Sequence, residues 1–348
     1  MPQPSTLARV ALAAALIAAF LLPAPPLAPA QEKSFSLKFS SWVPPAHGMH
    51  PTIKEWGESI SRATNGTVKV TLYPAQQLGK ADDHYDMARD GIAEVTYIAL
   101  GYQAGRLPMG EGINLPFLMT NADGGSRAVD EWYRKYHVKE MTDVKMCLAF
   151  VHDPGALHAK KKITRPEDIK GMKIRSAHGT MADFVTSLGG TNVRVSAPES
   201  RQALESGVAD AITFPWKSIL LFGIDKVVSY HMDLPFYVAS FAWLMNKATY
   251  EQMSPAQKRA IDAHCSPEWA GKVGKAWGDY EAAGRAEMRA LAGHTVYTLA
   301  PDEVAAWRRA AEPVYKTWAA AAAKTGFNAD QALSELRALL KKYNADFR

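Results

Sequence analysis

The chain has few of the features that mark several large protein classes. It contains only two cysteines in 348 residues, which allows one internal disulfide bond at most. The longest run of like charge is the three lysines 160–162, and the net charge of +5 is too dispersed to indicate a nucleic-acid partner. After residue 30 no stretch approaches about 18 uninterrupted apolar residues, so we expect a mature chain that is not embedded in a membrane.

The sequence motifs of common enzymes are also missing. The chain has no G-x-S-x-G elbow, P-loop, Rossmann glycine fingerprint or H-E-x-x-H zinc motif. Neither cysteine lies at an evident helix N-terminus beside a base, as an activated thiolate requires. His47 and His50 are three residues apart, but they lie in a Pro/Gly-rich turn without further ligands to complete a metal site. We expect no metal, no cofactor and no catalysis; an active site assembled from distant residues is the alternative.

The first thirty residues resemble a secretory signal peptide rather than part of the fold. Arg9 precedes an apolar run over 10–22, and Ala28-Pro29-Ala30 fits an A-x-A-like cleavage site. An uncleaved anchor is the alternative, but prolines interrupt the run and it is short for a membrane span. We therefore predict a periplasmic protein. Export permits a disulfide between Cys147 and Cys265, although Cys147 also fits a buried thiol in an apolar strand.

The segment after the leader has the pattern of an α/β domain. Strands are predicted at 35–42, 67–73 and 94–99, and helices at 51–63 and 80–90. This β-α-β-α-β order is typical of a parallel, doubly wound sheet. A helix is predicted to follow at 122–136.

A second group of short units follows a strongly apolar strand at 145–151, which we interpret as a crossing into a second domain. Residues 236–245 form another apolar strand and are the expected return crossing. Ser266-Pro267 is a strong helix start, and the helix to about residue 291 would be ~36 Å long, enough to run along both domains. The remaining short strands of this second group are expected at 156–160, 173–176, 191–195, 211–213 and 226–230.

Gly171 to His178 is the stretch with the clearest functional pattern. It predicts a short strand that leads through His178-Gly179 into an amphipathic helix over 180–188. Ligands of α/β sheets bind at the carboxyl ends of strands. Arg175 lies there, and its planar guanidinium can hold a carboxylate through two hydrogen bonds. A surface or salt-bridging arginine is the other interpretation that this stretch allows.

Several separated segments resemble the DctP-type solute-binding proteins of tripartite ATP-independent periplasmic (TRAP) transporters. Each segment alone is a weak signal, but together they occur in the family's order and spacing over about residues 35–295. The matching segments are Tyr73-Pro74-Ala75-Gln76-Gln77-Leu78-Gly79, Asp90-Gly91-Ile92-Ala93-Glu94, Leu115-Pro116-Phe117-Leu118, Ile169-Lys170-Gly171-Met172-Lys173-Ile174-Arg175 and Ala203-Leu204-Glu205-Ser206-Gly207-Val208-Ala209-Asp210.

The resemblance implies two α/β lobes around a cleft that closes on a small organic acid. Lobe I would comprise 31–151 with 238–266 returning to it, and lobe II 152–237; the spanning helix and C-terminal helices of 267–348 would pack on both. It also implies that Arg175 pairs with the ligand carboxylate and that the protein delivers the acid to the TRAP membrane permease. Coupling to a membrane sensor instead of a permease is a rival interpretation, and a periplasmic enzyme is the least favoured one.

One departure from the family bears on the ligand. Many relatives have asparagine where this chain has Phe214, and phenylalanine offers an apolar surface in place of hydrogen-bonding groups. We therefore expect an aromatic carboxylate, with a C4-dicarboxylate, a 2-oxo acid and a sugar acid as alternatives. Ordinary core packing is the rival role for most of the rings. Besides Arg175 and Phe214, the predicted ligand contacts are Trp42, His47, Tyr97, Tyr102, His178, Trp216 and Phe236.

Overall fold

The computed structural model describes residues 32–347, so the predicted signal peptide lies outside the described residues. The chain divides into two compact units, 1–33 and 34–348, and only the second is described below. Its strands form two sheets of five and six strands. Within residues 32–347, no helix is long and apolar enough to cross a membrane.

The first sheet has the strand order β2-β1-β3-β10-β4. It consists of β1 (Phe35–Ser40), β2 (Val68–Tyr73), β3 (Val95–Ala99), β4 (Val144–Val151) and β10 (Ser240–Asn246). β1 pairs in parallel with β2 and β3, as the sequence predicts. β10, however, is antiparallel to both β3 and β4. The parallel arrangement predicted for the first three strands is therefore confirmed, and the sheet as a whole is mixed because the strand that returns from the second sheet enters between β3 and β4 in the opposite direction.

The second sheet has the strand order β11-β9-β5-β8-β6-β7. The strand expected at 226–230 is wrong: these residues begin as a 3-10 turn after Gly223, whose positive φ of 66° starts a sharp bend, and pairing begins only at Tyr230. The strand expected at 236–245 is in fact two strands, one in each sheet. The members are β5 (Gly155–Ala159), β6 (Lys173–Arg175), β7 (Thr191–Val193), β8 (Ala211–Phe214), β9 (Tyr230–Tyr237) and β11 (Thr295–Tyr297).

Helices and short 3-10 turns connect and cover the strands. The α-helices are α2 (His50–Ala63), α3 (His84–Arg89), α4 (Ala122–Tyr136), α5 (Gly179–Ser187), α6 (Ser200–Glu205), α7 (Ser218–Leu221), α8 (Lys247–Glu251), α9 (Pro255–His264), α10 (Pro267–Ala290), α11 (Pro301–Ala323) and α12 (Ala329–Lys342). The 3-10 turns are η1 (Ala81–Asp83), η2 (Leu100–Tyr102), η3 (Gly110–Asn114), η4 (His137–Lys139), η5 (Pro166–Ile169), η6 (Ala197–Glu199) and η7 (Ile224–Val227).

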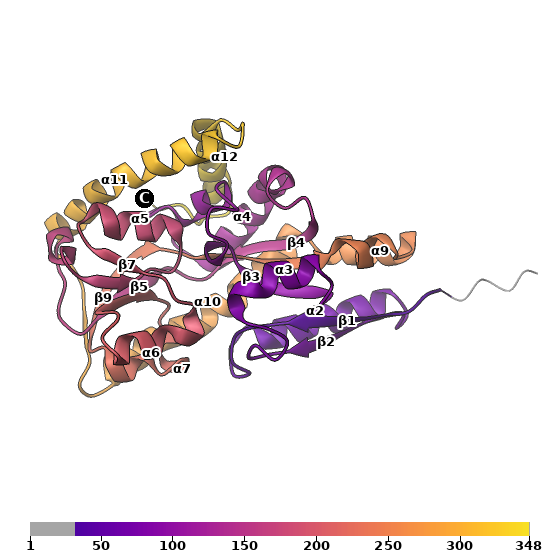
Figure 1. Cartoon of the computed structure of the whole chain (residues 1–348), viewed down its shortest axis with the longest axis horizontal. Helices are drawn as coiled ribbons and strands as arrows, with labels where there is room; N and C mark the ends of the chain where they lie inside the picture. The colour runs from indigo at the N-terminus through magenta and orange to yellow at the C-terminus, as the bar shows by residue number, and fades with distance from the viewer. Residues whose placement is uncertain (1–31, 348) are drawn as a thin grey trace, which may run out of the picture. The chain divides into compact units, whose positions relative to one another are not determined.

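The long helix α10 contacts elements associated with both sheets. The side chain of Ser266 caps its N-terminus by accepting from the Trp269 backbone N–H, as the Ser-Pro start predicts. The helix packs along α4 and β4 and also reaches α7 and β11. Figure 1 shows α10 between the β5–β9 group and the β1–β4 group. This helix thus connects the two halves of the fold, while the lobe boundaries at residues 151 and 238 stay a prediction.

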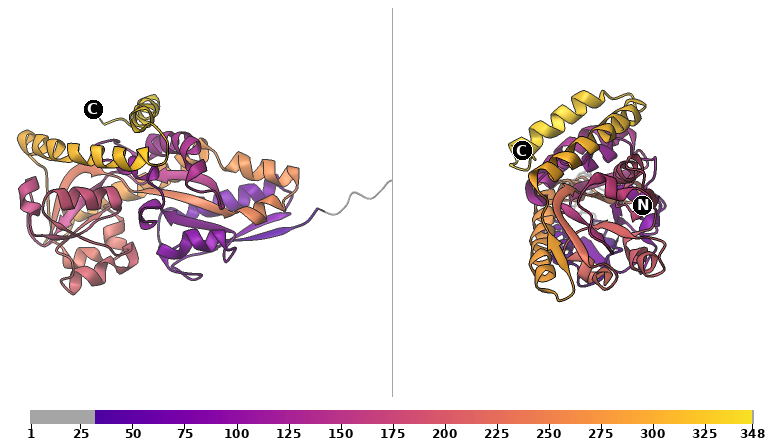
Figure 2. Two further views of the ribbon diagram at one scale, coloured as in Figure 1. Left: turned by 45° about the horizontal axis from the view of Figure 1, so that its top comes forward. Right: turned by 90° about the vertical axis from the view of Figure 1, so that its left-hand side faces the viewer.

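The two C-terminal helices lie together on one side of the unit, which Figure 2 shows in yellow. α11 packs on α5, and α12 packs on α4. On the first sheet's side, Cys147 of β4 and Cys265 after α9 form a disulfide with a Cα–Cα distance of 4.6 Å. Of the two interpretations that the sequence left open for these cysteines, the bonded one holds.

Candidate functional site

The two sheets present the carboxyl ends of their parallel strands at the candidate site. β6 is parallel to β8, with Arg175 opposite Ile212, so Arg175 and Phe214 reach the same sheet edge. In the first sheet β1 and β3 are parallel neighbours, which places Trp42 and Tyr102 just beyond one edge. This is the position where α/β folds bind ligands.

Arg175 is buried with neutral partners alone. Its side chain is 2 % exposed. Its Nε donates to the Val195 carbonyl at 3.1 Å, one Nη to the Thr213 carbonyl at 3.4 Å, and the other to the Tyr102 hydroxyl at 3.2 Å. Three of the five guanidinium N–H groups are thereby used. Within residues 32–347 no carboxylate forms an ion pair with it, so this cation lacks the partner that buried charges normally have.

A small space of ≈ 40 Å³, which we call the arginine cavity, lies against this guanidinium. That volume has room for about three water molecules, so a larger ligand requires the surrounding walls to move outward. Aromatic side chains and Arg175 form most of the wall. The lining residues are Trp42, Val43, His47, Ala99, Gly101, Tyr102, His152, Arg175, Ala177, Ala197, Thr213, Phe214, Pro215, Ser218, Phe222, Tyr237, Ala239, Ser240, Phe241 and Trp277.

Five of the nine predicted contact residues line the arginine cavity: Trp42, His47, Tyr102, Arg175 and Phe214. The guanidinium carbon of Arg175 lies 5.7 Å from the centre of the Phe214 ring, within the range of a cation–π contact. The Trp42 and Tyr102 rings are 5.9 Å apart. The cavity therefore places one cation beside several aromatic surfaces.

The other four predicted residues lie outside the cavity wall. Tyr97 is fully buried behind Trp42, with the two rings stacked at 5.0 Å. Trp216 packs edge-on against His158 at 5.2 Å, and Phe236 packs against Phe184 and Trp307. For these three side chains the structure shows core packing. His178 caps α5 by accepting from the Met181 N–H and borders a neighbouring pocket instead.

Several residues of the cavity wall were not predicted from the sequence. Ser240 and Phe241 come from the start of β10 and Trp277 comes from α10. Phe241 and Trp277 are 4.7 Å apart. Only the crossing strand at 236–245 pointed toward the first group, and nothing in the pattern of α10 distinguishes Trp277 from its other buried residues.

The two histidines in the wall are neutral. Burial lowers the pKa of His47 to about 3 and that of His152 to about 4. His152 uses both ring nitrogens on the backbone, donating to the Asp153 carbonyl at 2.5 Å and accepting from the Ala239 N–H at 3.0 Å. His152 therefore offers only its ring surface to the cavity. At neutral pH, Arg175 is the only charged side chain among the lining residues.

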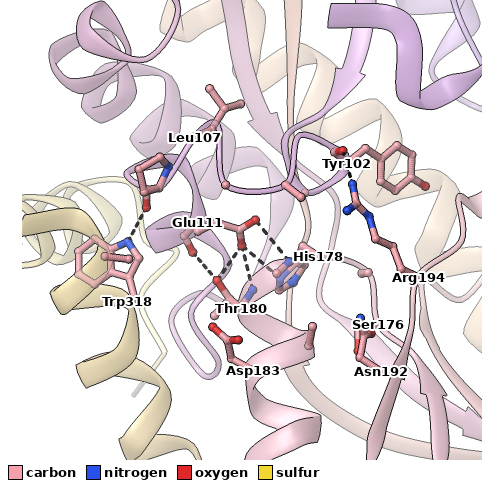
Figure 3. A pocket seen from close by; sticks show the side chains of 18 of the residues that line it. Tyr102, Leu107, Glu111, Ser176, His178, Thr180, Asp183, Asn192, Arg194 and Trp318 are labelled. Atoms are coloured by element: carbon pink, nitrogen blue, oxygen red, sulfur yellow. Dashed lines mark hydrogen bonds and ion pairs between the residues drawn. The ribbon is translucent and has the colours of Figure 1, made fainter. Parts of the chain in front are cut away.

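A larger pocket of ≈ 500 Å³, the outer pocket, shares Gly101, Tyr102 and Ala177 with the arginine cavity. Figure 3 shows Glu111 in this pocket, where its carboxylate accepts from the Thr180 N–H and hydroxyl at the start of α5, and Trp318, which donates to the Pro108 carbonyl.

The charge of the outer pocket differs from that of the cavity. Four carboxylates line it, those of Asp82, Glu111, Asp183 and Glu199, against the single cation Arg194. Burial, with Glu199 nearby, raises the pKa of Asp82, and burial, with Glu111 nearby, raises that of Asp183. This excess of negative charge disfavours an anion, so the arginine cavity is the better place for an acid.

A family model and several solved structures match this chain, and all of them are solute-binding proteins. Residues 39–321 match the family model of DctP, bacterial extracellular solute-binding protein, family 7. A TRAP solute-binding protein from Rhodoferax ferrireducens T118, solved with copurified benzoate, is 30 % identical with a TM-score of 0.84, covering 89 % of this chain and 99 % of that one. A second, from Bordetella bronchiseptica with bound (R)- and (S)-mandelate, is 29 % identical with a TM-score of 0.83, covering 88 % and 99 %.

A third similar structure comes from an unidentified marine microbe. It is a TRAP solute-binding protein specific for aromatic acid ligands, solved with 3-hydroxybenzoate, and it is 30 % identical with a TM-score of 0.83, covering 90 % of this chain and 99 % of that one. The family match extends over most of the chain, and the shared fold extends over nearly the whole of each solved relative. This chain therefore belongs to family 7 of the bacterial extracellular solute-binding proteins, the solute-binding proteins of TRAP transporters.

Proposed function

We propose that this protein captures an aromatic carboxylic acid outside the cytoplasm and delivers it to the permease of a TRAP transporter. The observation that carries the proposal is Arg175, a cation that is 2 % exposed and has only neutral hydrogen-bond partners. A buried charge without a counter-ion is unfavourable, and a ligand carboxylate would supply that counter-ion through the N–H groups that remain available.

The aromatic part of the proposal rests on the walls around this cation. Trp42, Phe214, Phe241 and Trp277 offer flat apolar surfaces that suit a ring rather than a chain of hydroxyl groups. Solved relatives of about 30 % identity hold benzoate, mandelate or 3-hydroxybenzoate, which supports the same ligand class. Since the arginine cavity is small, its walls would have to separate to admit the acid and then close on it, a hinge movement in which the ligand favours the closed arrangement.

A thermal-unfolding screen tests the proposal. Purified protein is heated with benzoate, mandelate, succinate, pyruvate and glucuronate, and each binding constant is then measured by calorimetry. A ligand at 100 times its Kd stabilises the native state by about 2.7 kcal/mol, which gives a clear shift in Tm. We expect the aromatic acids to raise Tm most. A shift from succinate, pyruvate or glucuronate alone would refute the aromatic preference and leave acid capture in place.

Two arginine variants separate the role of Arg175 from general charge. Arg175→Met removes the cation and keeps a side chain of similar length. Arg194→Met is the matched control, because Arg194 lines the outer pocket and donates to the Tyr102 carbonyl. We expect Arg175→Met to abolish the ligand-induced shift and Arg194→Met to retain it. If Arg175→Met binds the acid as tightly as the wild type, the proposed carboxylate site is wrong.

Delivery and chemistry are tested in the cell and in solution. Uptake of the labelled acid by the source bacterium should fall when the gene is deleted and return when it is restored. Unchanged uptake would argue for a sensor-coupled role. Recovery of the acid chemically unaltered after incubation with the protein is the result expected of a binding protein, and a modified product would indicate an enzyme.

A further inference from the structure

We propose that the acid bound in the arginine cavity carries a second, uncharged oxygen, such as a hydroxyl or keto group, and that Trp42, His47 and Ser240 bind it. This inference rests on the proposed function and narrows its ligand class to hydroxylated or oxo-substituted aromatic monocarboxylates. The starting observation is that two buried polar atoms in the cavity wall, Trp42 Nε1 and the Ser240 hydroxyl oxygen, have no hydrogen-bond partner among residues 32–347, and that His47 in the same wall uses only its Nδ1.

Trp42 supplies the first of these atoms. Its side chain is 5 % exposed, it lines the arginine cavity, and its indole Nε1 meets no hydrogen-bond acceptor among the described residues. An indole N–H is a donor only. Leaving such a donor buried and unpaired is unfavourable. A ligand that places a hydrogen-bond acceptor against it therefore binds more tightly than burial of its surface alone would give.

His47 supplies a second donor to the same wall, and its tautomer follows from its contact with the backbone. Its Nδ1 accepts from the Met49 N–H at 3.3 Å, so in the neutral ring Nε2 carries the hydrogen. His47 is 2 % exposed and lines the cavity, and within residues 32–347 no acceptor is bonded to Nε2. Its ring lies 5.1 Å from that of Trp277, inside the same aromatic wall. His47 therefore offers a second neutral donor.

Ser240 supplies the third. Its hydroxyl oxygen is buried in the wall, the residue is 1 % exposed, and in the described part of the chain the hydroxyl has no hydrogen-bond partner. A serine hydroxyl both donates and accepts. It can therefore bind a ligand hydroxyl in either direction, whereas Trp42 and His47 can only donate to one.

The positions of these groups indicate a ligand with polar atoms in two places. Arg175 ends a strand of the second sheet, whereas Trp42 and His47 follow β1 and Ser240 begins β10, both strands of the first sheet. A carboxylate on Arg175 and a second oxygen on the first-sheet groups would connect the two halves of the fold. Binding through both ends would then favour the closed arrangement more than binding through Arg175 alone.

The charge of the cavity wall indicates whether the second oxygen of the ligand is neutral or part of a carboxylate. Trp42, His47 and Ser240 are all neutral, and Arg175 is the only lining cation. A second carboxylate buried against neutral donors would lack a counter-ion, which makes it far less favourable than a hydroxyl or a carbonyl. The geometry thus favours hydroxy- and oxo-monocarboxylates over aromatic dicarboxylates.

Calorimetric titration with benzoate, 3-hydroxybenzoate, 4-hydroxybenzoate, phenylglyoxylate and isophthalate tests the inference. We expect at least one hydroxy or oxo acid to bind about tenfold or more tightly than benzoate, since one satisfied buried hydrogen bond changes affinity by roughly that factor. Isophthalate, with two carboxylates, should bind more weakly than that acid. Equal Kd values for benzoate and all its substituted analogues would overturn the inference, and so would tightest binding by isophthalate.

Two variants and one matched control assign the preference to the wall. Trp42→Phe and the smaller change Ser240→Ala should each lower the ratio of benzoate Kd to hydroxy-acid Kd severalfold. Trp243→Phe is the control, because its indole Nε1 is also buried and has no hydrogen-bond partner in the described part of the chain, but Trp243 does not line the cavity. Trp243→Phe should leave the ratio unchanged. If both cavity variants keep the wild-type ratio, the assignment is overturned. If Trp42→Phe is too unstable to titrate, an unchanged ratio in Ser240→Ala alone has the same consequence.

The outcome also separates this inference from the proposed function. If all aromatic monocarboxylates bind equally and Arg175→Met abolishes every one of them, the carboxylate site stands and the second-oxygen site is wrong. If no aromatic acid binds the wild type, the proposed ligand class is wrong and the inference falls with it.

Discussion

The hydroxyl of Tyr102 connects the candidate carboxylate site to the first sheet. It accepts from an Nη of Arg175 at 3.2 Å and from the Ala197 N–H at 2.8 Å, while burial raises the pKa of the phenol so that it stays protonated. Tyr102→Phe would leave both donors without this acceptor. We expect it to lower the free energy of unfolding by about 1–3 kcal/mol and to weaken acid binding about tenfold, since Arg175 would lose one of the contacts that orient it.

Tyr97→Phe is the matched control for this prediction. Tyr97 is also fully buried near the cavity, but its hydroxyl has no hydrogen-bond partner in the described chain. Removing an unpaired hydroxyl should leave stability unchanged within about 0.5 kcal/mol or increase it. Urea unfolding and calorimetry measure both effects. Equal losses in the two variants would contradict the role given to the Tyr102 hydroxyl.

At the same scale, the sequence predicts residues whose chemistry is local and fails for those whose role depends on packing. Arg175 was predicted because it ends a short strand that leads into a helix, and Phe214 because it stands where many relatives of the resembled family have asparagine. Trp216 and Phe236 are aromatic residues near predicted strand ends, as the cavity rings are. In the structure, however, Trp216 packs against His158 and Phe236 against Trp307 in the core. Whether an aromatic ring faces the cavity or the core depends on contacts between residues that are far apart in the sequence. The pattern of a single sequence does not show such contacts.

At the scale of elements, α10 holds part of the cavity wall in place through Glu281. The carboxylate is buried and accepts from the Lys217 N–H at 2.5 Å, the Ser218 N–H at 3.1 Å and hydroxyl, and the Trp277 indole N–H at 2.8 Å. Burial raises the pKa of this carboxyl. Ser218 and Trp277 line the arginine cavity, so one side chain joins the long helix to the start of α7 and fixes two wall residues.

Glu281→Ala should therefore affect both stability and binding. It leaves three buried N–H donors and one hydroxyl unpaired, so we expect a loss of about 3 kcal/mol or more in the free energy of unfolding and at least a tenfold weaker Kd for the acid. Glu287→Ala is the control on the same helix, since Glu287 is half exposed and pairs with the Lys217 ammonium. That variant should lose less than about 1 kcal/mol. A mild Glu281→Ala with unchanged Kd would contradict this account.

Helices and strands were largely predictable where a periodic pattern of apolar residues extends over a long segment. The pattern places a helix at 122–136, and the structure has α4 over the same residues. Pairing partners were not predictable, because the antiparallel insertion of β10 and the addition of β11 to the second sheet depend on segments that lie far apart in sequence. The strand predicted at 226–230 overlaps the end of the 3-10 turn Ile224–Val227 and only its last residue is in a strand, because a short apolar run has no distinguishing period.

At the scale of the whole molecule, buried neutral histidines make the fold sensitive to acid. Burial lowers the pKa of His47 to about 3, of His152, His158 and His178 each to about 4, and of His231 to about 2. The unfolded chain protonates these rings near pH 6.5, whereas the folded chain does not until far lower pH. Because the unfolded state binds more protons below pH 6.5, their contribution to stability is complete above that pH and is lost as the pH falls.

We therefore expect the free energy of unfolding to decrease between pH 7.5 and pH 5.5. Each such histidine adds a slope of up to about 1.4 kcal/mol per pH unit once the pH is below 6.5. Asp130 acts in the opposite direction, because burial raises its pKa to about 6 and the folded state then binds the proton first, but this offset begins only near that pH. Urea unfolding at pH 7.5, 6.5 and 5.5 measures the balance.

His231→Gln tests the assignment to the histidines. His231 lies in a hydrogen-bonded row between His158 and His294, with ring-nitrogen distances of 2.8 Å and 2.9 Å, and glutamine can occupy such a row without titrating. The variant should show a shallower loss of stability toward pH 5.5 than the wild type, by about one bound proton. Acid affinity should stay nearly constant from pH 7.5 to pH 6.5, since an aromatic carboxylate remains ionised there and the wall histidines stay neutral. A stability that is flat or rises toward pH 5.5 would contradict the histidine account, and a Kd that weakens in parallel with stability would mean that the site and the fold respond to the same protons.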